Sequence, residues 1–474
     1  MKNKLGKFLI FGILILGFAL RMYKINNEIA DWHSWRQVDT ASVTKFLLKD
    51  REILTPKYFD LSNIQTGHEN PKGYRFVEFP IFNIFHALIY TYSTLSFEGS
   101  GRMVSILAAL TTGFFLYLIG KKLQGRKMGL LAAFFYLTLP YNIYFTRVIL
   151  PGPLAVCFSI ASIYLFMIYL EKDKNKFLFI SAILLSLAIL TKPHSIFFAI
   201  PMLFLTFQKY GFRKSLQKIP LYIALDIALV PFFLWRAWMN YGDHYVGIPH
   251  FAWSLNGNHI RFKPAFWRWI FGERIGKLIL GYWGLIPFGI GVLYRKTHIL
   301  ISLLCLSSFL YLSVFASANV MHDYYQIFII PSISLAVASG FITLNQRIYS
   351  NKYVSLFISI IILVVMYSTS LFYIKDNYNI NDYRALDAAR YVDQNLPLDA
   401  KVIAPYNGDT MFLYHTNRSG WPVVTTDIDS MIRLGADYYV STNLSDQDTL
   451  EFSSRFETVY KNDQFVILNL RKEL

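Results

Sequence analysis

The chain has 474 residues, of which 54% are hydrophobic, 17% aromatic and only 16% charged, and its mean hydropathy is +0.36. This composition excludes an ordinary soluble domain, and apolar runs long enough to cross about 30 Å of hydrocarbon recur along the chain. The net charge of +16 does not indicate a nucleic-acid partner, because most of the basic excess lies between apolar runs, where it sets membrane topology. Cys157 and Cys305 fall inside apolar runs and offer neither a disulfide framework nor a zinc site. The sequence therefore predicts a polytopic α-helical membrane protein.

The first apolar run extends from Phe8 to Leu20. A signal peptide is the alternative, but no small-residue cleavage site follows, and the next residue is Arg21. We therefore predict an uncleaved first helix over about 6–23, followed by a long outer loop over about 24–100.

A segment within this loop, FPIFNIFHALIYTYSTLSF at 79–97, is apolar enough to span a membrane. It carries Asn83 and His86 and opens with Pro80, a good first-turn residue of a helix. If this segment spanned, the basic cluster at 121–127 would lie outside. We predict instead an interfacial helix in the outer leaflet, with a partner at about 39–50.

Clusters of Lys and Arg separate the apolar runs, at 2–7, 121–127, 172–176, 209–218, 295–296 and 347–352. If all are cytoplasmic, the positive-inside rule predicts about eleven transmembrane helices, with the N-terminus inside and the C-terminus outside. Helices 2 to 11 are expected over about 101–120, 127–144, 153–170, 177–191, 194–208, 219–238, 276–294, 298–316, 326–344 and 353–373. A second long outer loop covers about 239–275.

The composition changes at about residue 374, where helix-like and strand-like patterns begin to alternate, as in DYRALDAARYVDQNL, AKVIAPY and QFVILNL. This tail contains no nucleotide-binding loop of the GxxxxGKS type. We predict a transmembrane domain over 1–373 and a small extracytoplasmic α/β domain over 374–474.

The predicted topology brings ionisable and aromatic side chains to the outer boundary of the membrane, where such groups cost energy and commonly mark a functional site. They are Asp31, His33, Arg36, Asp39 and Glu78 in the first loop; Arg147 between helices 3 and 4; Lys192 and His194 at the tip of the helix 5–6 hairpin; Arg236, Asp243, His244, His250 and Arg261 in the second loop; and Asn319, His322, Asp323, Tyr324 and Tyr325 before helix 10.

Several of these residues also have a purely structural interpretation. Lys192 and Arg147 can extend their charged ends from the membrane edge into water. His322, Tyr324 and Tyr325 fit an interfacial aromatic belt.

The first-loop residues have structural alternatives of their own. Asp39 followed by Thr, Ala and Ser fits the N-cap of the interfacial helix, which is compatible with catalysis. Asp31 fits a loop carboxylate, and His33 and Arg36 fit partners of these two acids.

The order of several motifs resembles the GT-C class of membrane glycosyltransferases, in the branch of protein O-mannosyltransferases, aminoarabinose transferases and their bacterial relatives. The matching features are a first helix before a long outer loop with an acid and two interfacial helices, an R…LPxP turn, LTKPH at a hairpin tip, HDYYQIFIIP before a late helix, and an outer α/β tail. HSWRQVDTAS is similar to the form in a bacterial subgroup. The resemblance covers most of residues 1–345, whereas the tail matches only in kind.

The resemblance implies that a sugar carried on a polyprenyl phosphate is transferred to an acceptor hydroxyl on the outer face, with a first-loop Asp as general base. The base maps onto Asp39, because DTAS starts the interfacial helix as the family's acid does, and Asp31 is the second candidate. A carboxylate within hydrogen-bond reach of the hydroxyl can take its proton, and cations at headgroup depth can neutralise the leaving phosphate. The implied substrate-binding residues are His33, Arg36, Glu78, Arg147, Lys192, His194, His322, Tyr324 and Tyr325.

Two positions depart from the family pattern. Relatives often carry an acidic pair where this chain has Trp35, Arg36 and Gln37, and an acid where it has Gly152. Acids at such places help to hold a divalent cation in metal-dependent relatives, so Gly152 weakens the case for a metal cofactor. The departures also leave a catalytically inactive homologue open.

Two further function classes stay open, a lipid or glycan transporter or flippase and a non-enzymatic membrane protein whose outer domain binds a partner. Transporters commonly place polar groups at the bilayer midplane, whereas here they gather at one face. The expected partners are a polyprenyl-phosphate sugar lipid, a glycan, lipid or protein acceptor, and membrane lipids. The expected location is a bacterial or archaeal plasma membrane.

The topology is testable with reporter fusions. Fusions at about 123, 173 and 212 should report the cytoplasm, and fusions at about 60 and 420 should report the outside, because the basic clusters stay inside. An outside signal at 123 would contradict the predicted topology and would mean that the proposed site residues do not all lie on one side of the membrane.

Overall fold

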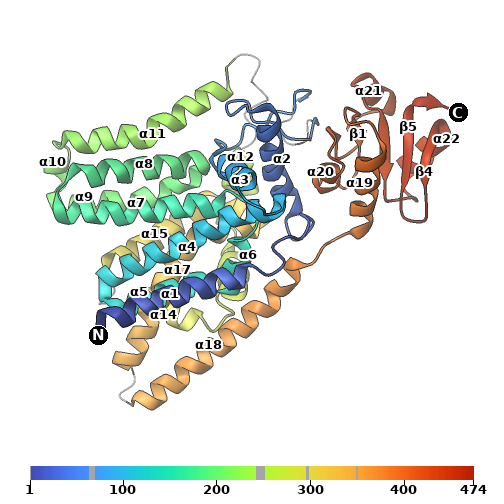
Figure 1. The fold of residues 1–474 in the computed structure, drawn as a ribbon. Coiled ribbons are helices and arrows are strands. Elements are labelled where there is room, and N and C mark those ends of the chain that lie inside the picture. Colours follow the sequence, from blue (N-terminus) through green and yellow to red (C-terminus); the bar gives the residue numbers. More distant parts are fainter. Residues whose placement is uncertain (1, 63, 65–69, 242–250, 295–297, 349–350) are drawn as a thin grey trace. The chain divides into compact units, whose positions relative to one another are not determined.

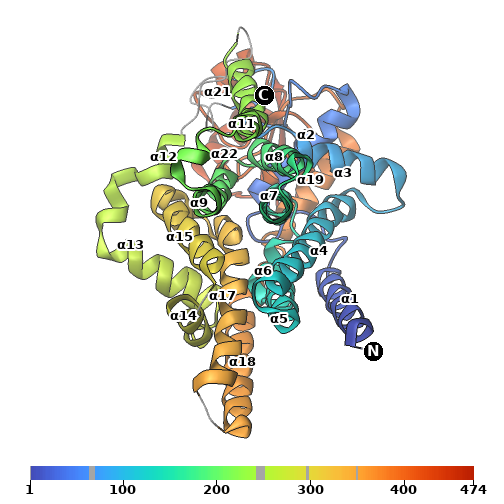
Figure 2. The ribbon, with the colours of Figure 1, turned by 90° about the vertical axis from the view of Figure 1, so that its left-hand side faces the viewer.

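The structure, a computed structural model, describes residues 2–62, 64, 70–241, 251–294, 298–348 and 351–474 (Figures 1 and 2). Arg295, Lys296, Asp243, His244 and His250 lie outside the described residues. The chain forms two compact units: unit 1 contains Met1–Ile25, Arg102–Arg236 and His250–Asp376, and unit 2 contains Asn26–Gly101, Ala237–Pro249 and Asn377–Leu474. The first outer loop is thus counted with the tail, and the division into residues 1–373 and 374–474 stays a prediction.

Unit 1 is a bundle of apolar helices whose limits follow the predicted ones closely. The main helices are α1 (Lys2–Arg21), α4 (Phe97–Gln124), α5 (Arg126–Thr138), α6 (Pro140–Phe145), α7 (Gly152–Lys172), α8 (Asn175–Thr191), α9 (Ala199–Tyr210), α10 (Phe212–Ser215), α11 (Ile219–Met239), α14 (Leu285–Leu293), α15 (Ile299–Val314), α17 (Ile330–Thr343) and α18 (Lys352–Ile374). Smaller elements are the 3-10 segment Pro193–Phe198, α12 (Phe251–Asn256), the 3-10 segment Gly257–Phe262, α13 (Pro264–Arg268), the π-helix Trp269–Ile279, α16 (Ala316–Met321), the 3-10 segment Asp323–Ile329, the π-helix Leu344–Ile348 and the 3-10 segment Lys375–Tyr378.

Within the described residues, five helices are long and apolar enough to cross a membrane: Phe97–Gln124, Gly152–Lys172, Ile219–Met239, Asp323–Gln346 and Lys352–Asn395. Shorter apolar helices cover Ile81–Tyr92, Asn175–Thr191 and Ile299–Val314. These helices support a polytopic membrane protein, and the number of eleven crossings stays a prediction.

The prediction of one continuous helix over 276–294 is wrong, because the chain turns between the π-helix Trp269–Ile279 and α14. At the turn, Gly281 has a φ of +49°, which favours glycine. A side chain there would meet the Met366 carbonyl oxygen at 2.1 Å, so α18 packs directly on the turn.

Arg21 anchors the end of the first helix inside unit 1. Its side chain is fully buried and donates to Thr146 Oγ1 and to the Leu137 carbonyl, both at 2.8 Å. A buried guanidinium needs such acceptors, so α1 is an integral part of the unit.

Unit 2 combines two helices of the first loop with the α/β tail. Its helices are α2 (Ser34–Asp50), α3 (Ile81–Tyr92), α19 (Tyr383–Asn395), α20 (Met411–His415), α21 (Ile428–Arg433) and α22 (Gln447–Arg455), and its strands are β1 (Val402–Ile403), β2 (Gly420–Trp421), β3 (Tyr438–Ser441), β4 (Phe456–Lys461) and β5 (Val466–Glu473). The sheet order is β2-β1-β3-β5-β4, with β1 parallel to β2 and β3, and β5 antiparallel to β3 and β4.

The two predicted loop helices are present and pack against each other. Asn83 in α3 donates to the Thr40 carbonyl of α2 at 2.7 Å and to Thr44 Oγ1 at 2.9 Å. This pairing explains a polar residue in an otherwise apolar segment. At 12 residues, α3 is too short by itself to cross about 30 Å of hydrocarbon, and its position at the interface stays a prediction.

The loop also extends the tail sheet at its β2 edge. Gly420 of β2 donates its backbone N–H to the Phe59 carbonyl at 3.0 Å and accepts from the Leu61 N–H at 2.8 Å. Asp60, between these two loop residues, forms a parallel bridge with Gly420. Loop and tail thus share one hydrogen-bonded sheet.

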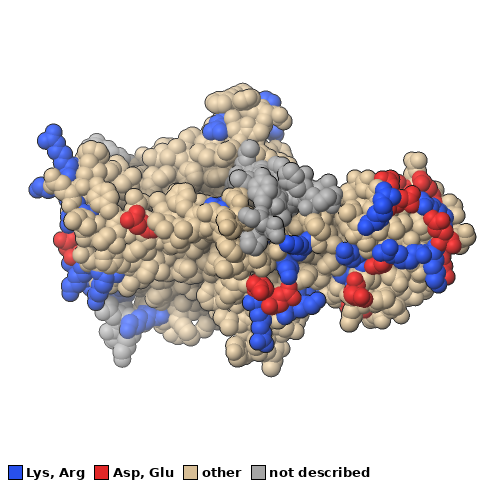
Figure 3. All heavy atoms as spheres, turned by 90° about the horizontal axis from the view of Figure 1, so that it is seen from above, with Lys and Arg blue, Asp and Glu red and all other residues tan. Residues whose placement is uncertain are grey.

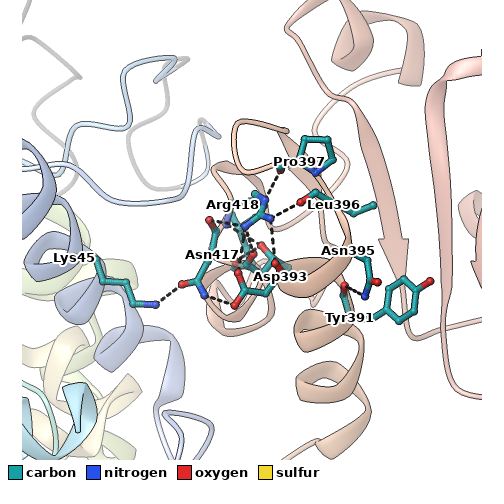
Figure 4. A network of polar contacts seen from close by, with 10 residues as sticks. Lys45, Tyr391, Asp393, Asn395, Leu396, Pro397, Asn417 and Arg418 are labelled. Carbon is teal, nitrogen blue, oxygen red and sulfur yellow. Dashed lines mark hydrogen bonds and ion pairs between the residues drawn. The ribbon is translucent and has the colours of Figure 1, made fainter. Parts of the chain in front are cut away.

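A polar network joins α2 to the tail through Asn417 (Figure 4). Lys45 Nζ donates to Asn417 Oδ1 at 2.5 Å, and Asn417 Nδ2 donates to Asp393 of α19 at 2.8 Å. The neighbouring Arg418 is 1% exposed and donates to the Pro397 and Leu396 carbonyls at 2.6 and 2.7 Å. The amide links the loop lysine to the end of α19.

Asp60 makes the stability of unit 2 depend on pH. Its carboxylate is buried, and this burial, with a smaller effect of Asp39, raises its pKa to about 7. The native state therefore binds more protons than the unfolded state between about pH 4 and pH 7, and stability should fall as pH rises through that window, by at most about 1.4 kcal/mol per pH unit.

We expect Asp60→Asn to make this slope shallower, which thermal unfolding of the purified protein in detergent from pH 4.5 to 8 can measure. The matched control is Asp399→Asn, since Asp399 is exposed in the tail. Equal slopes in wild type and Asp60→Asn would show that Asp60 does not carry the effect.

Candidate active site

Asp39 lies in the second turn of α2, and its side chain is 1% exposed. Arg75 Nη2 lies 2.9 Å from Asp39 Oδ2, and Thr410 Oγ1 donates to Asp39 Oδ1 at 2.7 Å. The carboxylate is therefore held from both sides, by a loop guanidinium and a tail hydroxyl. The N-cap interpretation of Asp39 is wrong, because α2 begins five residues earlier, at Ser34, and its N-cap is His33.

His33 has a left-handed backbone conformation, with φ 57° and ψ 36°. A non-glycine residue in this region is strained by about 1–3 kcal/mol, and such strain is common at functional sites. The His33 ring lies 4.9 Å from the Trp32 ring, between centroids, and is only partly buried. His33 is thus more accessible than Asp39.

Arg36 pairs with Glu78. The two side chains form a buried ion pair, and Arg36 also donates to Thr40 Oγ1 one turn later, at 3.1 Å. The expected pairing of Arg36 with Asp31 or Asp39 stays a prediction. The pair joins the first turn of α2 to the segment that leads into α3.

Asp31 is 2% exposed and accepts from Gln37 Nε2 at 2.7 Å. The Asn381 side chain donates to the Asp31 carbonyl at 3.3 Å. Gln37, one of the departures from the family pattern, therefore orients the second candidate base. Asp31 lies before the start of α2 and Asp39 lies within it, and Gln37 donates to the first whereas Thr410 donates to the second.

Sequence reasoning missed four residues around these acids: Arg75, Asp60, Thr410 and Asp409. Asp409 accepts from the Met411 backbone N–H at 2.7 Å and from Ser34 Oγ at 3.4 Å. Burial, with a smaller effect of nearby Asp39, raises the pKa of Asp409 to about 6. Two of these residues lie more than 300 positions from α2, so no local spacing could have indicated them.

The predicted residues of unit 1 form a separate aromatic group. Lys192 is 7% exposed and its ammonium lies 5.8 Å from the Tyr325 ring centroid. The His194 ring lies 5.4 Å from the same ring, and His322 stacks on Tyr324 at 5.4 Å. The structure thus brings these five predicted residues together.

Arg147 lies elsewhere in unit 1. It is fully buried and donates to the Lys24 carbonyl at 2.8 Å, just after α1. Another largely buried cation, Arg274 of the π-helix, was missed by sequence reasoning. It lies 3.6 Å from the Asp323 carboxylate and donates to the Val320 carbonyl at 2.7 Å.

The predicted residues therefore fall into two groups, one in each unit. Unit 2 holds Asp31, His33, Arg36, Asp39 and Glu78, and unit 1 holds Arg147, Lys192, His194, His322, Tyr324 and Tyr325. The first group offers carboxylates for proton transfer, and the second offers a cation and aromatic faces.

The donor set does not fit a divalent cation. Among the described residues, no group of three or more His, Cys, Asp or Glu side chains could hold one. Asp31, Asp39 and Glu78 instead accept from an amide, a hydroxyl and guanidinium groups of the chain. The turn position of Gly152 offers no side-chain ligand.

Residues 81–238 match the family model described as dolichyl-phosphate-mannose-protein mannosyltransferase. A search of the curated proteins found no match.

Solved structures share the fold at low sequence identity. ArnT from Cupriavidus metallidurans, solved with undecaprenyl phosphate, is 10% identical with a TM-score of 0.68, covering 98% of this chain and 97% of ArnT. The oligosaccharyltransferase AglB from Archaeoglobus fulgidus, solved with an inhibitory peptide and dolichol-phosphate, is 11% identical with a TM-score of 0.60, covering 98% and 74%. A structure of the Archaeoglobus fulgidus oligosaccharyltransferase with zinc and sulfate is also 11% identical with a TM-score of 0.60, covering 97% and 73%. The predicted resemblance to the GT-C class of membrane glycosyltransferases is confirmed, and the chain has the ArnT-like fold along nearly its whole length.

Proposed function

We propose that this protein is an integral membrane glycosyltransferase that moves a sugar from a polyprenyl-phosphate donor to an acceptor on the extracytoplasmic face. The observation that carries the proposal is the buried Asp39 carboxylate, oriented by Arg75 and Thr410 within a chain of GT-C fold. The titles of the ArnT and AglB structures, which name undecaprenyl phosphate and dolichol-phosphate, support a lipid-phosphate donor.

Asp39 serves as the general base in this proposal. A carboxylate oxygen can accept from more than one donor at a time, so an acceptor hydroxyl that reaches Asp39 can donate to it beside Arg75 and Thr410. As the acceptor oxygen bonds to the anomeric carbon, its proton moves to Asp39. The bond from that carbon to the phosphate oxygen breaks, and its electron pair stays with the phosphate. Asp31 is the second candidate for the same role.

The remaining predicted residues bind substrates in this proposal. Lys192 neutralises the leaving phosphate as charge develops on it, because a preorganised cation stabilises such charge strongly where water is scarce. The rings of Tyr324, Tyr325 and His322 beside it offer flat faces to the donor. Arg36 and Glu78, with His33, flank the base, and His194 and Arg147 support the phosphate side.

The proposal includes the membrane arrangement. Eleven crossings, a cytoplasmic N-terminus and an extracytoplasmic tail in a plasma membrane would place the base and the phosphate group on the same side. The charge pattern of the loops supports this arrangement.

A catalytically inactive GT-C-like protein is the second candidate. Both oxygens of Asp39 already accept donors within the chain, which also fits a purely structural ion pair. Activity measurements separate the two candidates.

The first experiment uses purified protein in liposomes with a panel of radiolabelled polyprenyl phosphosugars, and scores sugar release or transfer. We expect turnover with one donor and a loss of more than about 100-fold in Asp39→Ala, because general-base catalysis contributes about 10²–10⁴. Asp399→Ala is the matched control, since that carboxylate is exposed in the tail. Turnover that survives in folded Asp39→Ala but not in Asp31→Ala would transfer the role to Asp31. The absence of turnover with every donor and acceptor would favour the inactive candidate.

Thr410 should position Asp39. Thr410→Val keeps the shape but removes the buried O–H donor, so we expect kcat to fall about 10- to 100-fold, since a hydrogen bond to a charged group is worth roughly 1.5–3 kcal/mol. Thr410→Ser retains a hydroxyl and should recover most of the rate. Donor KM should change little in both variants. An equal loss in Thr410→Val and Thr410→Ser, or a shift confined to KM, would contradict a positioning role.

A further inference from the structure

Unit 1 contains an apolar groove along helices α8 and α9. Its volume is about 290 Å³, and it is lined by α7, α8, α9, α10 and α11 through residues such as Phe166, Ala182, Met202, Leu221 and Ala228. Lys192 and His194 lie at the opposite end of α8, beyond Thr191, whereas the groove reaches Ser215 and Leu216 near the α10–α11 turn. The groove is therefore distinct from the site residues of unit 1.

The hydroxyl groups of the few polar residues that line the groove donate to backbone carbonyls. Ser181 donates to the Ser162 carbonyl at 2.8 Å, Thr206 to the Met202 carbonyl at 2.9 Å, and Ser215 to the Gly211 carbonyl at 2.8 Å. With these groups satisfied, the groove presents a hydrocarbon surface. Its occupant must be apolar at this depth.

Helix α11 forms one wall of the groove and contributes little to the bundle core. Only 17% of its most apolar window is buried, against 94% for the span Asp323–Gln346. Figures 1 and 2 both show α11 beside α8 and α9 at the margin of the bundle. A dry void between membrane helices loses dispersion contacts on all its walls, so a chain molecule that fills the space is favoured.

One end of the groove, at Ser215 and Leu216, adjoins a basic segment of the chain. The α9–α11 turn contains Lys209, Arg213, Lys214 and Lys218, and Asp173 lies 3.7 and 3.8 Å from the Lys209 and Lys218 ammonium groups. Arg213 and Lys214 are exposed and immediately precede the lining residues Ser215 and Leu216. Figure 3 shows Lys and Arg side chains at the end of the molecule where this turn lies.

We propose that this groove binds an anionic glycerophospholipid, such as phosphatidylglycerol. An acyl chain of the lipid lies in the apolar groove, and its phosphate lies against Arg213 and Lys214. Charge complementarity selects the anionic headgroup, and the apolar walls select a lipid over a free phosphate. Pockets between membrane helices that are lined by Lys and Arg commonly bind the headgroups of anionic lipids. This site does not depend on the proposed glycosyltransferase function.

The test measures lipid binding to the purified full chain by native mass spectrometry in detergent. Phosphatidylglycerol, phosphatidylcholine with the same acyl chains, and undecaprenyl phosphate are titrated separately. We expect wild type to bind phosphatidylglycerol at least tenfold more tightly than phosphatidylcholine. The double variant Arg213→Ala/Lys214→Ala should bind phosphatidylglycerol about 30-fold more weakly. This is the loss of affinity expected when two basic side chains beside an anionic lipid are removed.

The matched control for charge is Lys174→Ala/Lys176→Ala, which removes two basic side chains from the neighbouring α7–α8 turn. This control should keep wild-type affinity. A second pair of variants tests the groove: Ala228→Phe fills it and should weaken binding, whereas Val230→Phe adds the same ring at an exposed position of α11 and should not.

Three outcomes would overturn the proposal. Equal losses in both double variants would indicate general charge attraction. Equal affinity for phosphatidylcholine would remove the role of the headgroup. Tighter binding of undecaprenyl phosphate than of phosphatidylglycerol, lost in the same variants, would assign the groove to the polyprenyl lipid instead.

Discussion

The buried carboxylate of Asp39 is the constraint on which the rest of unit 2 depends. A carboxylate taken out of water must be paired and hydrogen-bonded, or it is strongly destabilising. Its two donors come from distant parts of the chain, Arg75 from the loop and Thr410 from the tail. The loop segment around Arg75 and the β1–α20 connection around Thr410 must therefore hold their positions together. The shared sheet edge at Gly420 and the Lys45–Asn417 contact stabilise that arrangement.

The acids of unit 2 differ in the states that their surroundings favour. Arg75 pairs with Asp39, and Arg36 pairs with Glu78, so each of these two acids has a guanidinium group beside it. Burial raises the pKa of Asp60 to about 7 and that of Asp409 to about 6. Protons bound to these two carboxylates reduce the negative charge around Asp39. The acids of unit 2 thus differ in their surroundings, with guanidinium groups beside Asp39 and Glu78 and mainly burial at Asp60 and Asp409.

The sequence predicted what depends on local pattern. Hydropathy located the helices of unit 1 within a few residues, because a buried or lipid-facing helix must be apolar along its length. It failed over 276–294, where the tight approach of α18 to Gly281 decides the turn. It identified Asp39 and Asp31, but not Arg75, Thr410 or Asp60, since contacts between residues hundreds of positions apart leave no periodicity. The N-cap interpretation of Asp39 failed because α2 extends back to a strained His33.

The sheet that loop and tail share has a consequence for biosynthesis. Asp39 emerges from the ribosome 371 residues before Thr410, which at ~5–20 residues/s is on the order of 20–70 s. During that interval the loop segment Phe59–Leu61 has no β2 edge to join, and the carboxylate lacks its hydroxyl donor. The loop segment therefore stays unpaired until β2 has been synthesised. Once the tail has been synthesised, the loop segment can pair with β2 at the edge of the sheet.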